Sequence, residues 1–353
     1  MKKRRLLWLL LPMGLLVGLI YYSGLPSQQP LLYQKSVQLS SLDQQINQSY
    51  RIETITLPDD YEGKVLATLL SKPASHPSDS AVIYLHGWAD YFFHDHVAKW
   101  FNEQGFDFYA LELRKYGRSL LPHQKPNYCR DLQEYFPELD SAIQRITQRD
   151  GHQHLLLFGH STGGLTGALY ASQGNQRKAI DQIVLNSPFL GFKADALSMN
   201  LLRFYGFLGR FNYNAVLPRE GSPLYTQTIH SSEKGEWDFN FAWRPRTGFP
   251  FYQSWTNAII NGHSKVDQGL NIECPVLMLT SEQSYSGGEL GPKAMRSDVV
   301  LDAPTIRTKA TKLGKNVSSK AIPGGLHDIF LSPLPVREKA FSAIEQWMKK
   351  QED

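Results

Sequence analysis

Cysteine is almost absent from this sequence, which has only Cys129 and Cys274 among its 353 residues. No Cys-x-x-Cys pair or Cys/His cluster indicates a structural metal site. The nearest pattern is His94-Asp95-His96, which lacks a further clustered ligand and instead predicts a helix start with exposed histidines. Cysteines this far apart are more often unpaired core thiols than a disulfide, which would need an oxidising compartment. We therefore expect neither a metal nor another cofactor.

An excess of charge of one sign is also lacking. The formal net charge is +4, and the basic residues at positions 2–5 supply much of it. The near-balanced remainder gives no electrostatic support for nucleic-acid binding. The chain has no internal repeats. Its hydrophobic content of 42% and charged content of 20% are typical of one large α/β domain, or of such a domain with an insertion.

The N-terminus carries the one long apolar run. Four basic residues, 2–5, precede an apolar run from Leu6 to Tyr22, about the minimum length of a membrane span. The positive-inside rule places the basic residues in the cytoplasm and the rest of the chain on the outer, periplasmic side of the inner membrane. A cleavable signal peptide begins in the same way and would give a secreted or periplasmic protein. Because residues 21–25 make a poor cleavage site, we favour a retained anchor over residues 1–25.

Three further segments follow the anchor. Residues 26–47 are rich in Gln and Ser, which predicts a mostly extended linker, with a short helix over residues 35–46 as an alternative for its second half. Residues 48–353 are expected to form the folded domain. Within it, residues 187–269 are crowded with aromatics and show no alternation of strands and helices. We interpret this stretch as an inserted lid over the carboxyl edge of the sheet, where ligands bind in such folds.

Strands and helices alternate through the rest of the domain. Two strands of alternating polarity, 50–57 and 65–70, predict a β-hairpin at an antiparallel edge. Buried strands are expected at 81–85, 106–113, 155–158, 180–185, 275–280 and 316–322. Helices are expected at 94–104, 131–149, 165–171 and 335–350. This spacing predicts a mostly parallel central sheet with helices on both faces.

A strand, a tight turn and a helix meet in one short stretch. The apolar strand ends in Gly159-His160-Ser161-Thr162-Gly163, and a run of small residues follows. This Gly-x-Ser-x-Gly pattern is typical of a nucleophile elbow, in which a strained turn holds the serine above the sheet. The glycines lack the Cβ atoms that would clash as strand and helix close on each other. Ser161 is therefore the candidate nucleophile.

A serine nucleophile needs a base, and the base needs an acid. His327 lies in a Gly-rich loop after the last expected strand, the place where such a base is expected in the chain. The acid should follow the strand at 275–280. Its candidates are Glu282, Asp298 and Asp302, and spacing alone does not decide among them.

The tetrahedral intermediate also needs two backbone N–H donors for its oxyanion. Thr162, directly after the nucleophile, supplies one at the N-terminus of the helix. The second is expected where His86-Gly87-Trp88 ends an earlier strand, from the N–H of Trp88.

The chain from about residue 50 to 348 resembles the serine α/β-hydrolases of the monoacylglycerol lipase, lysophospholipase and serine aminopeptidase S33 group. The residues that carry the resemblance are Leu85-His86-Gly87, the elbow, and Leu326-His327-Asp328. In one bacterial branch the acid lies in a stretch similar to residues 297–302, which selects Asp298. Thr280-Ser281-Glu282-Gln283 departs from the Gly-Glu-x-Asp turn of the commoner members.

The resemblance implies a membrane-anchored serine hydrolase that cleaves carboxylic esters through an acyl-enzyme. An aromatic lid and a membrane tether suit a lipid-like ester, such as a monoacylglycerol or lysophospholipid. The alternative is an aminopeptidase or amidase with the same triad, which would need acidic lid residues to hold a substrate ammonium group. The candidates for that role are Glu220, Glu233, Glu236 and Asp238. An anchored binding protein without catalysis is disfavoured by the complete set of Ser, His and acid.

Overall fold

The computed structural model describes residues 39–352 apart from 193–195, 209–211 and 217–220. The expected anchor, residues 1–25, lies outside the described residues, as does most of the expected linker. Among the helices of the described part, none has both the length and the hydropathy to cross a membrane. Cys129, which is buried, and Cys274, which is half-buried, are both free thiols.

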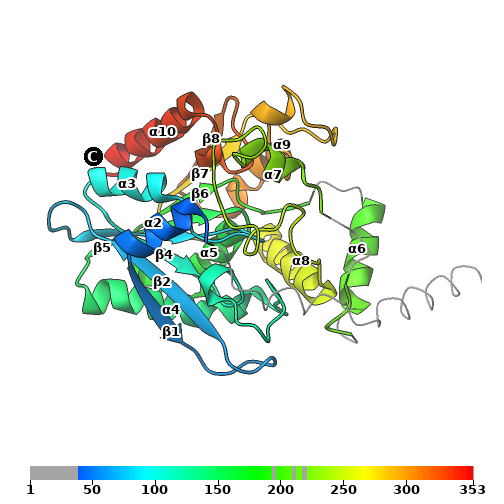
Figure 1. Ribbon diagram of the computed structural model, residues 1–353, viewed down its shortest axis with the longest axis horizontal. Helices are drawn as coiled ribbons and strands as arrows, with labels where there is room; N and C mark the ends of the chain where they lie inside the picture. Colours follow the sequence, from blue (N-terminus) through cyan, green and yellow to red (C-terminus); the bar gives the residue numbers. More distant parts are fainter. Residues whose placement is uncertain (1–38, 193–195, 209–211, 217–220, 353) are drawn as a thin grey trace, which may run out of the picture.

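A single eight-stranded sheet runs through the described residues, in the order β1-β2-β4-β3-β5-β6-β7-β8 (Figure 1). The strands are β1 (Arg51–Thr56), β2 (Leu66–Lys72), β3 (Ser80–Leu85), β4 (Asp107–Glu112), β5 (His154–His160), β6 (Gln182–Asn186), β7 (Val276–Ser281) and β8 (Val317–Ile322). β2 pairs antiparallel with β1 and with β4, and every other neighbouring pair is parallel. The expected mostly parallel sheet with an antiparallel hairpin at one edge is confirmed.

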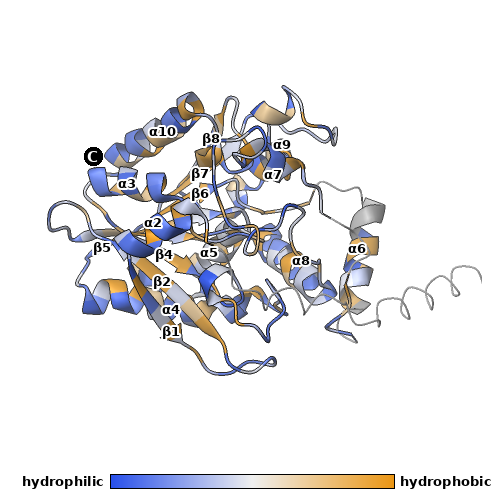
Figure 2. Cartoon of the chain, viewed as in Figure 1, coloured by the Kyte–Doolittle hydropathy of each residue, from blue (hydrophilic) through white to orange (hydrophobic). Residues whose placement is uncertain are grey.

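Both faces of the sheet are buried, because side chains alternate between two separate cores along each strand. In β3, Ile83 belongs to one core, while its neighbours Val82 and Tyr84 belong to the other. In β5, Leu157 and Phe158 divide in the same way. The central strands are therefore almost continuously hydrophobic, as expected of parallel strands covered on both sides (Figure 2).

Helices cover both faces, as the sequence predicts. α2 (Ser41–Ser49), α3 (Asp95–Glu103) and α10 (Leu334–Glu352) contribute to one core, for example through Phe101 and Ile344. α4 (Phe136–Gln144), α5 (Ser161–Gln173) and α8 (Gln253–Gln268) contribute to the other core, for example through Leu139, Leu165 and Ile259. A short helix, α9 (Ala303–Thr308), lies between β7 and β8 in the chain.

The structured part of the chain begins before residue 48, where we expected the folded domain to start. Ser40 caps α2 through a reciprocal capping box with Asp43. Ile46 is completely buried in the core beside the sheet. Asp43 is buried as well and forms an ion pair with Arg118 at 3.4 Å. The last residues of the Gln/Ser-rich stretch thus belong to the domain.

The insertion between β6 and β7 carries α6 (Ala196–Leu208), α7 (Leu224–Ile229) and α8. Its last helix is a core helix. Ile259 and Val266 of α8 are fully buried, and a Cβ at Gly262 would lie 3.3 Å from Leu165 of α5. The last helix of the expected lid of 187–269 thus packs against α5, while the bounds of the lid stay a prediction.

Candidate active site

The nucleophile lies at the junction of β5 and α5. Ser161 is the first residue of the helix and has a left-handed backbone with φ of +51°. A Cβ at Gly163 would lie 2.2 Å from the carbonyl oxygen of His86, and one at Gly159 would lie 2.8 Å from the Cα of Gly164. Any larger residue at 159 or 163 would push strand and helix apart. The elbow therefore has the geometry expected from its sequence.

The structure brings Ser161, His327 and Asp298 together in one chain of hydrogen bonds. His327 comes from the loop after β8, and its Nε2 lies 3.0 Å from Ser161 Oγ. Its Nδ1 lies 3.0 Å from Asp298 Oδ2. Because a carboxylate only accepts hydrogen bonds, Nδ1 carries the proton and Nε2 accepts from the serine hydroxyl. This is the tautomer that a general base beside a serine requires.

Asp298 is itself held in place by the backbone. Its Oδ1 accepts hydrogen bonds from the N–H groups of Val300 and Leu301, both at 2.8 Å. The carboxylate is buried, with 1% of the residue exposed. Oδ1 is thus fixed by its own loop, and Oδ2 is left to orient the histidine.

The other two candidate acids have different surroundings. Glu282 directly follows β7 and is exposed to solvent. Asp302 caps α9, where its side chain accepts from the N–H of Thr305 at 3.0 Å. Among the three candidates that the sequence left open, Asp298 is the one whose carboxylate contacts His327 in the described structure.

The two expected oxyanion donors belong to two different segments near the nucleophile. Thr162 follows Ser161 at the start of α5, and Trp88 lies in the loop after β3. That loop is close to the nucleophile, since a Cβ at Gly87 would lie 3.2 Å from Ser161 Cβ. Within the described part of the chain, neither the Trp88 N–H nor the Thr162 N–H donates to a protein acceptor. Both are therefore available to a substrate oxygen.

A buried polar cluster that we did not predict lies behind the triad. Asp328 is fully buried and accepts from Asn186 Nδ2 at 2.7 Å, and its Oδ2 lies 2.9 Å from His94 Nε2. Burial would raise the pKa of Asp328, but the nearby His160 and His94 outweigh it and lower that pKa well below its usual range. The cluster holds the backbone directly after His327, because Asp328 Oδ1 also caps the following turn.

His160 separates this cluster from the catalytic histidine candidate. Its ring lies 5.0 Å from that of His327, centroid to centroid. Burial lowers the pKa of His160 to about 4, so its imidazole is neutral at pH 7. A neutral neighbour does not oppose a positive charge on His327.

The histidines of the His94-Asp95-His96 pattern are not exposed, contrary to our expectation. His94 is fully buried against Asp328, and His96 lies 2.8 Å from the carbonyl oxygen of Phe330. Their partners lie more than two hundred residues away in sequence, so no local pattern could reveal them. Among the described residues, no group of three or more His, Cys, Asp or Glu is placed to hold a metal.

Aromatic residues of the insertion cover the site. Tyr225 of α7 packs edge-on against His327 with ring centroids 5.2 Å apart. Phe251 stacks on Trp88 at 4.5 Å and an interplanar angle of 15°. Ser161 itself is 8% exposed. The insertion therefore contacts both His327 and the loop beside the nucleophile.

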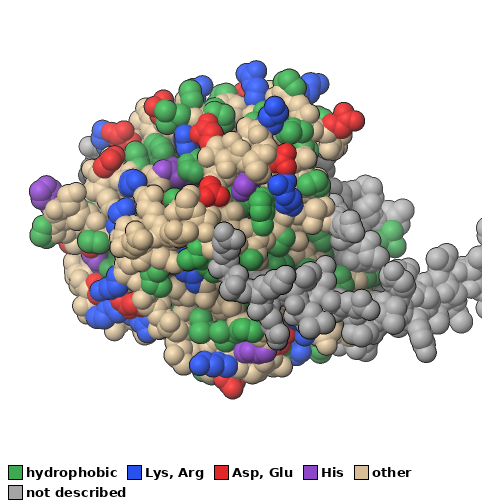
Figure 3. Space-filling model, viewed as in Figure 1, with side chains coloured by type: hydrophobic (Ala, Val, Ile, Leu, Met, Phe, Trp, Pro, Cys, Tyr) green, Lys and Arg blue, Asp and Glu red, His purple; other side chains and the backbone are tan. Residues whose placement is uncertain are grey.

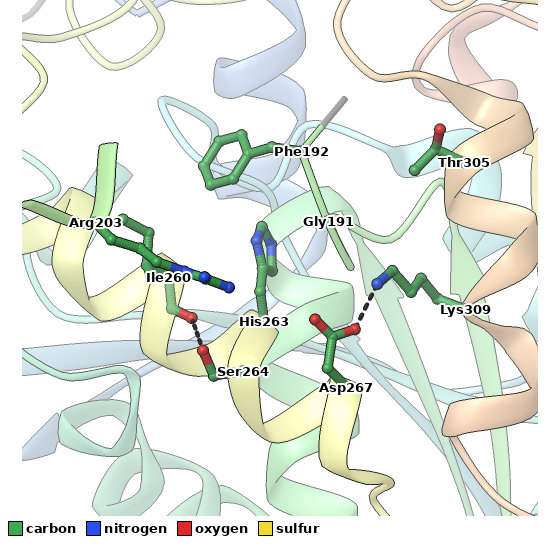
Figure 4. Close-up of a pocket in the computed structure, with 9 residues that line it drawn as sticks. All are labelled: Gly191, Phe192, Arg203, Ile260, His263, Ser264, Asp267, Thr305 and Lys309. Atoms are coloured by element: carbon green, nitrogen blue, oxygen red, sulfur yellow. Dashed lines mark hydrogen bonds and ion pairs between the residues drawn. The ribbon is translucent and has the colours of Figure 1, made fainter. Parts of the chain in front are cut away.

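A separate cavity of about 160 Å³ lies beside α8 (Figure 4). Arg203 of α6, His263 of α8 and Lys309, which directly follows α9, project toward it, and Lys309 forms an ion pair with Asp267. Ser161, His327 and Asp298 do not line this cavity, so we assign the cavity no part in the chemistry. On the face of the molecule seen in Figure 3, acidic and basic side chains are interspersed rather than gathered by sign.

Comparison with known proteins decides the family. The sequence profile of the family "serine aminopeptidase, S33" matches residues 76–283, more than half of the chain. The chain belongs to this family. The S33 match ends before His327 and Asp298, so the placement of those two residues relies on the geometry given above. No curated protein matches this chain.

Solved structures show the fold of this S33-family protein. A soluble variant of the monoglyceride lipase of Saccharomyces cerevisiae matches with a TM-score of 0.62 and 15% identity, covering 91% of this chain and 99% of that one. The monoacylglycerol lipase of Paleococcus ferrophilus gives 0.57 and 19%, covering 84% and 97%. A carboxyl esterase from Bacillus coagulans gives 0.58 and 12%, covering 85% and 98%. The protein is thus an α/β-fold serine hydrolase.

The hydrogen bonds of the site predict which carboxylate matters for activity. Changing Asp298→Asn should lower kcat about 10³–10⁴-fold, because the amide favours the wrong histidine tautomer. Changing the exposed Glu282→Gln should leave kcat within about twofold. The measurement is steady-state hydrolysis of a p-nitrophenyl ester by both variants. A large loss in Glu282→Gln together with a small one in Asp298→Asn would contradict the arrangement.

Proposed function

We propose that this protein cleaves carboxylic esters, with Ser161 as nucleophile, His327 as general base and Asp298 as the acid that orients it. The observation that carries the proposal is the 3.0 Å contact between His327 Nε2 and a serine Oγ held on a left-handed turn. A serine hydroxyl is a weak nucleophile at neutral pH, and this contact supplies the base that activates it.

The reaction proceeds through an acyl-enzyme. Ser161 Oγ bonds to the ester carbonyl carbon while His327 Nε2 takes its proton. The N–H groups of Trp88 and Thr162 hold the resulting oxyanion. When the tetrahedral intermediate collapses, the bond between the carbonyl carbon and the alcohol oxygen breaks. The alcohol leaves with the proton that His327 had taken. Water then attacks the acyl-enzyme, giving its proton to His327, and the carboxylic acid is released as Ser161 regains its hydrogen.

A lipid-like ester, such as a monoacylglycerol or a lysophospholipid, is the substrate class that we favour. Two similar structures are lipases of monoglycerides or monoacylglycerols, one of them solved with a substrate analogue. The insertion also presents exposed apolar side chains on α6, including Leu201 and Phe204. A helix of this kind suits contact with an acyl chain or a lipid surface.

A membrane location follows from the N-terminal sequence. The basic residues 2–5 and the apolar run 6–22 form a retained anchor at the inner membrane, with the catalytic domain on the periplasmic side. A secreted or periplasmic protein after cleavage is the alternative. Full-length protein that stays in membranes through an alkaline carbonate wash supports the anchor, and a shortened chain in the soluble fraction supports cleavage.

The family name makes an aminopeptidase the second candidate, but the acidic residues of the insertion do not favour it. Glu220 lies outside the described residues. Glu233 pairs with Arg246, and Glu236 pairs with Arg337 at 3.0 Å. Asp238 accepts hydrogen bonds from Ser41. Each of these three carboxylates thus has a partner at the surface, away from any common ammonium site.

A fluorophosphonate probe tests the nucleophile. Such a probe reacts with a serine that an adjacent base activates, and we expect it to label the protein once per chain. Changing Ser161→Ala should abolish the label, as measured by intact-protein mass spectrometry. The matched control is Ser172→Ala in the same helix, which should label like the unmodified chain. A label that persists in Ser161→Ala would refute the assignment.

A substrate panel separates ester from amide chemistry. The protein should hydrolyse p-nitrophenyl esters with a kcat/KM that rises about tenfold or more from acetyl to octanoyl, because each methylene buried adds roughly 0.8 kcal/mol. Amino-acid p-nitroanilides should be cleaved at least about a hundredfold more slowly. Faster turnover of the anilides would favour the aminopeptidase instead.

A further inference from the structure

A buried ion pair connects the insertion to the loop that carries the oxyanion donor. Arg244 lies between α7 and α8, and its guanidinium bonds the Oδ1 of Asp90. Asp90 follows Trp88 by two residues. Only 4% of Arg244 and 2% of Asp90 is exposed. The two charges therefore interact with little screening by water.

Aromatic rings enclose the arginine. Its guanidinium carbon lies 5.4 Å from the ring centre of Phe93, 5.1 Å from Tyr225 and 4.9 Å from Phe239. Tyr225 is the residue that also packs against His327. Arg244 is thus held between the part of the insertion that contacts the catalytic base and the loop that ends β3.

Asp90 also binds the backbone of the loop that follows β3. Its Oδ2 accepts from the N–H of Gly87 at 3.2 Å. Asn127 Oδ1 accepts from the N–H of Ala89 at 2.9 Å, where the backbone has a left-handed φ of +49°. The N–H groups before and after Trp88 are therefore both tied to buried side chains. In the described structure, the N–H of Trp88 is left without a protein acceptor.

We infer that Arg244 is a positioning residue for the oxyanion hole, acting through Asp90 on the loop from Gly87 to Ala89. The inference rests on the proposed function, in which the Trp88 N–H holds the oxyanion. Burying an arginine and a carboxylate adds little net stability over apolar residues of similar size. The ion pair of Arg244 and Asp90 therefore makes more sense as a device that orients the Trp88 N–H than as a source of stability.

Positioning of this kind acts on the transition state more than on substrate binding. The oxyanion forms only as the ester carbonyl is attacked, so a displaced donor lowers kcat and leaves KM nearly constant. A trifluoromethyl ketone reports on the same oxygen, because Ser161 Oγ bonds to its carbonyl carbon while His327 Nε2 takes the serine proton, which leaves the former carbonyl oxygen as the anion of a hemiketal. Its affinity should fall by the same factor as kcat/KM.

The test is Arg244→Met, which keeps the length of the stem and removes the ion pair. We expect kcat for a p-nitrophenyl ester to fall about 10–100-fold with KM changed less than about threefold, a smaller loss than removal of a whole oxyanion donor. The ketone should bind about 10–100-fold more weakly. Arg246→Met is the matched control, since Arg246 lies two residues away in an exposed pair with Glu233 and should behave as the unmodified protein.

A second variant separates positioning from stability. Arg244→Met leaves Asp90 buried without its partner, whereas the double variant Asp90→Asn/Arg244→Met leaves no unpaired charge and should unfold near the temperature of the unmodified protein. Its kcat should remain low, because the amide at position 90 can still accept from Gly87 but lacks the arginine that fixes its orientation. Recovery of kcat together with stability would overturn the inference, as would unchanged kcat and ketone affinity in Arg244→Met. If the unmodified protein is not labelled by fluorophosphonate, the proposed function fails instead.

Discussion

The left-handed backbone at Ser161 is the constraint on which the rest of the site depends. It lets β5 turn directly into α5, so the serine hydroxyl stands at the carboxyl edge of the sheet. The turn is sterically possible because Gly159 and Gly163 allow strand, helix and the end of β3 to meet. The same close approach brings the loop containing Trp88 beside the nucleophile. Strain of about 1–3 kcal/mol at such a residue persists only when the surrounding packing determines it fully.

Two sets of buried polar groups lie near this turn, which is costly unless each is paired. Asp328 holds the chain after His327 through Asn186 and His94. The ion pair of Asp90 and Arg244 ties the insertion to the loop after β3. His327, the proposed base, and the loop of Trp88, the proposed oxyanion donor, thus each lie next to buried charged groups that take no part in the proposed bond making.

Much of this arrangement follows from sequence, since buried parallel strands and the Gly-x-Ser-x-Gly turn are local patterns. The acid was ambiguous because Asp298 reaches His327 only through the path of a long polar loop, which spacing does not specify. The burial of His94 was missed because its partner is remote in sequence. The burial of α8 could not be predicted either, because the aromatic residues of 187–269 gave no sign of which helix of the insertion packs into the core. The roles of Asp90 and Arg244 depend on contacts across more than 150 residues.

Direct detection of the acyl-enzyme tests the central claim most closely. The protein is mixed with an excess of an octanoyl ester, quenched in acid within the first turnovers and digested for peptide mass spectrometry. We expect an octanoyl adduct on the peptide that contains Ser161, which forms before the second product and disappears as the ester is consumed. Turnover of the ester with an adduct on another residue, or with no adduct under conditions where release of the acid is rate-limiting, would contradict it.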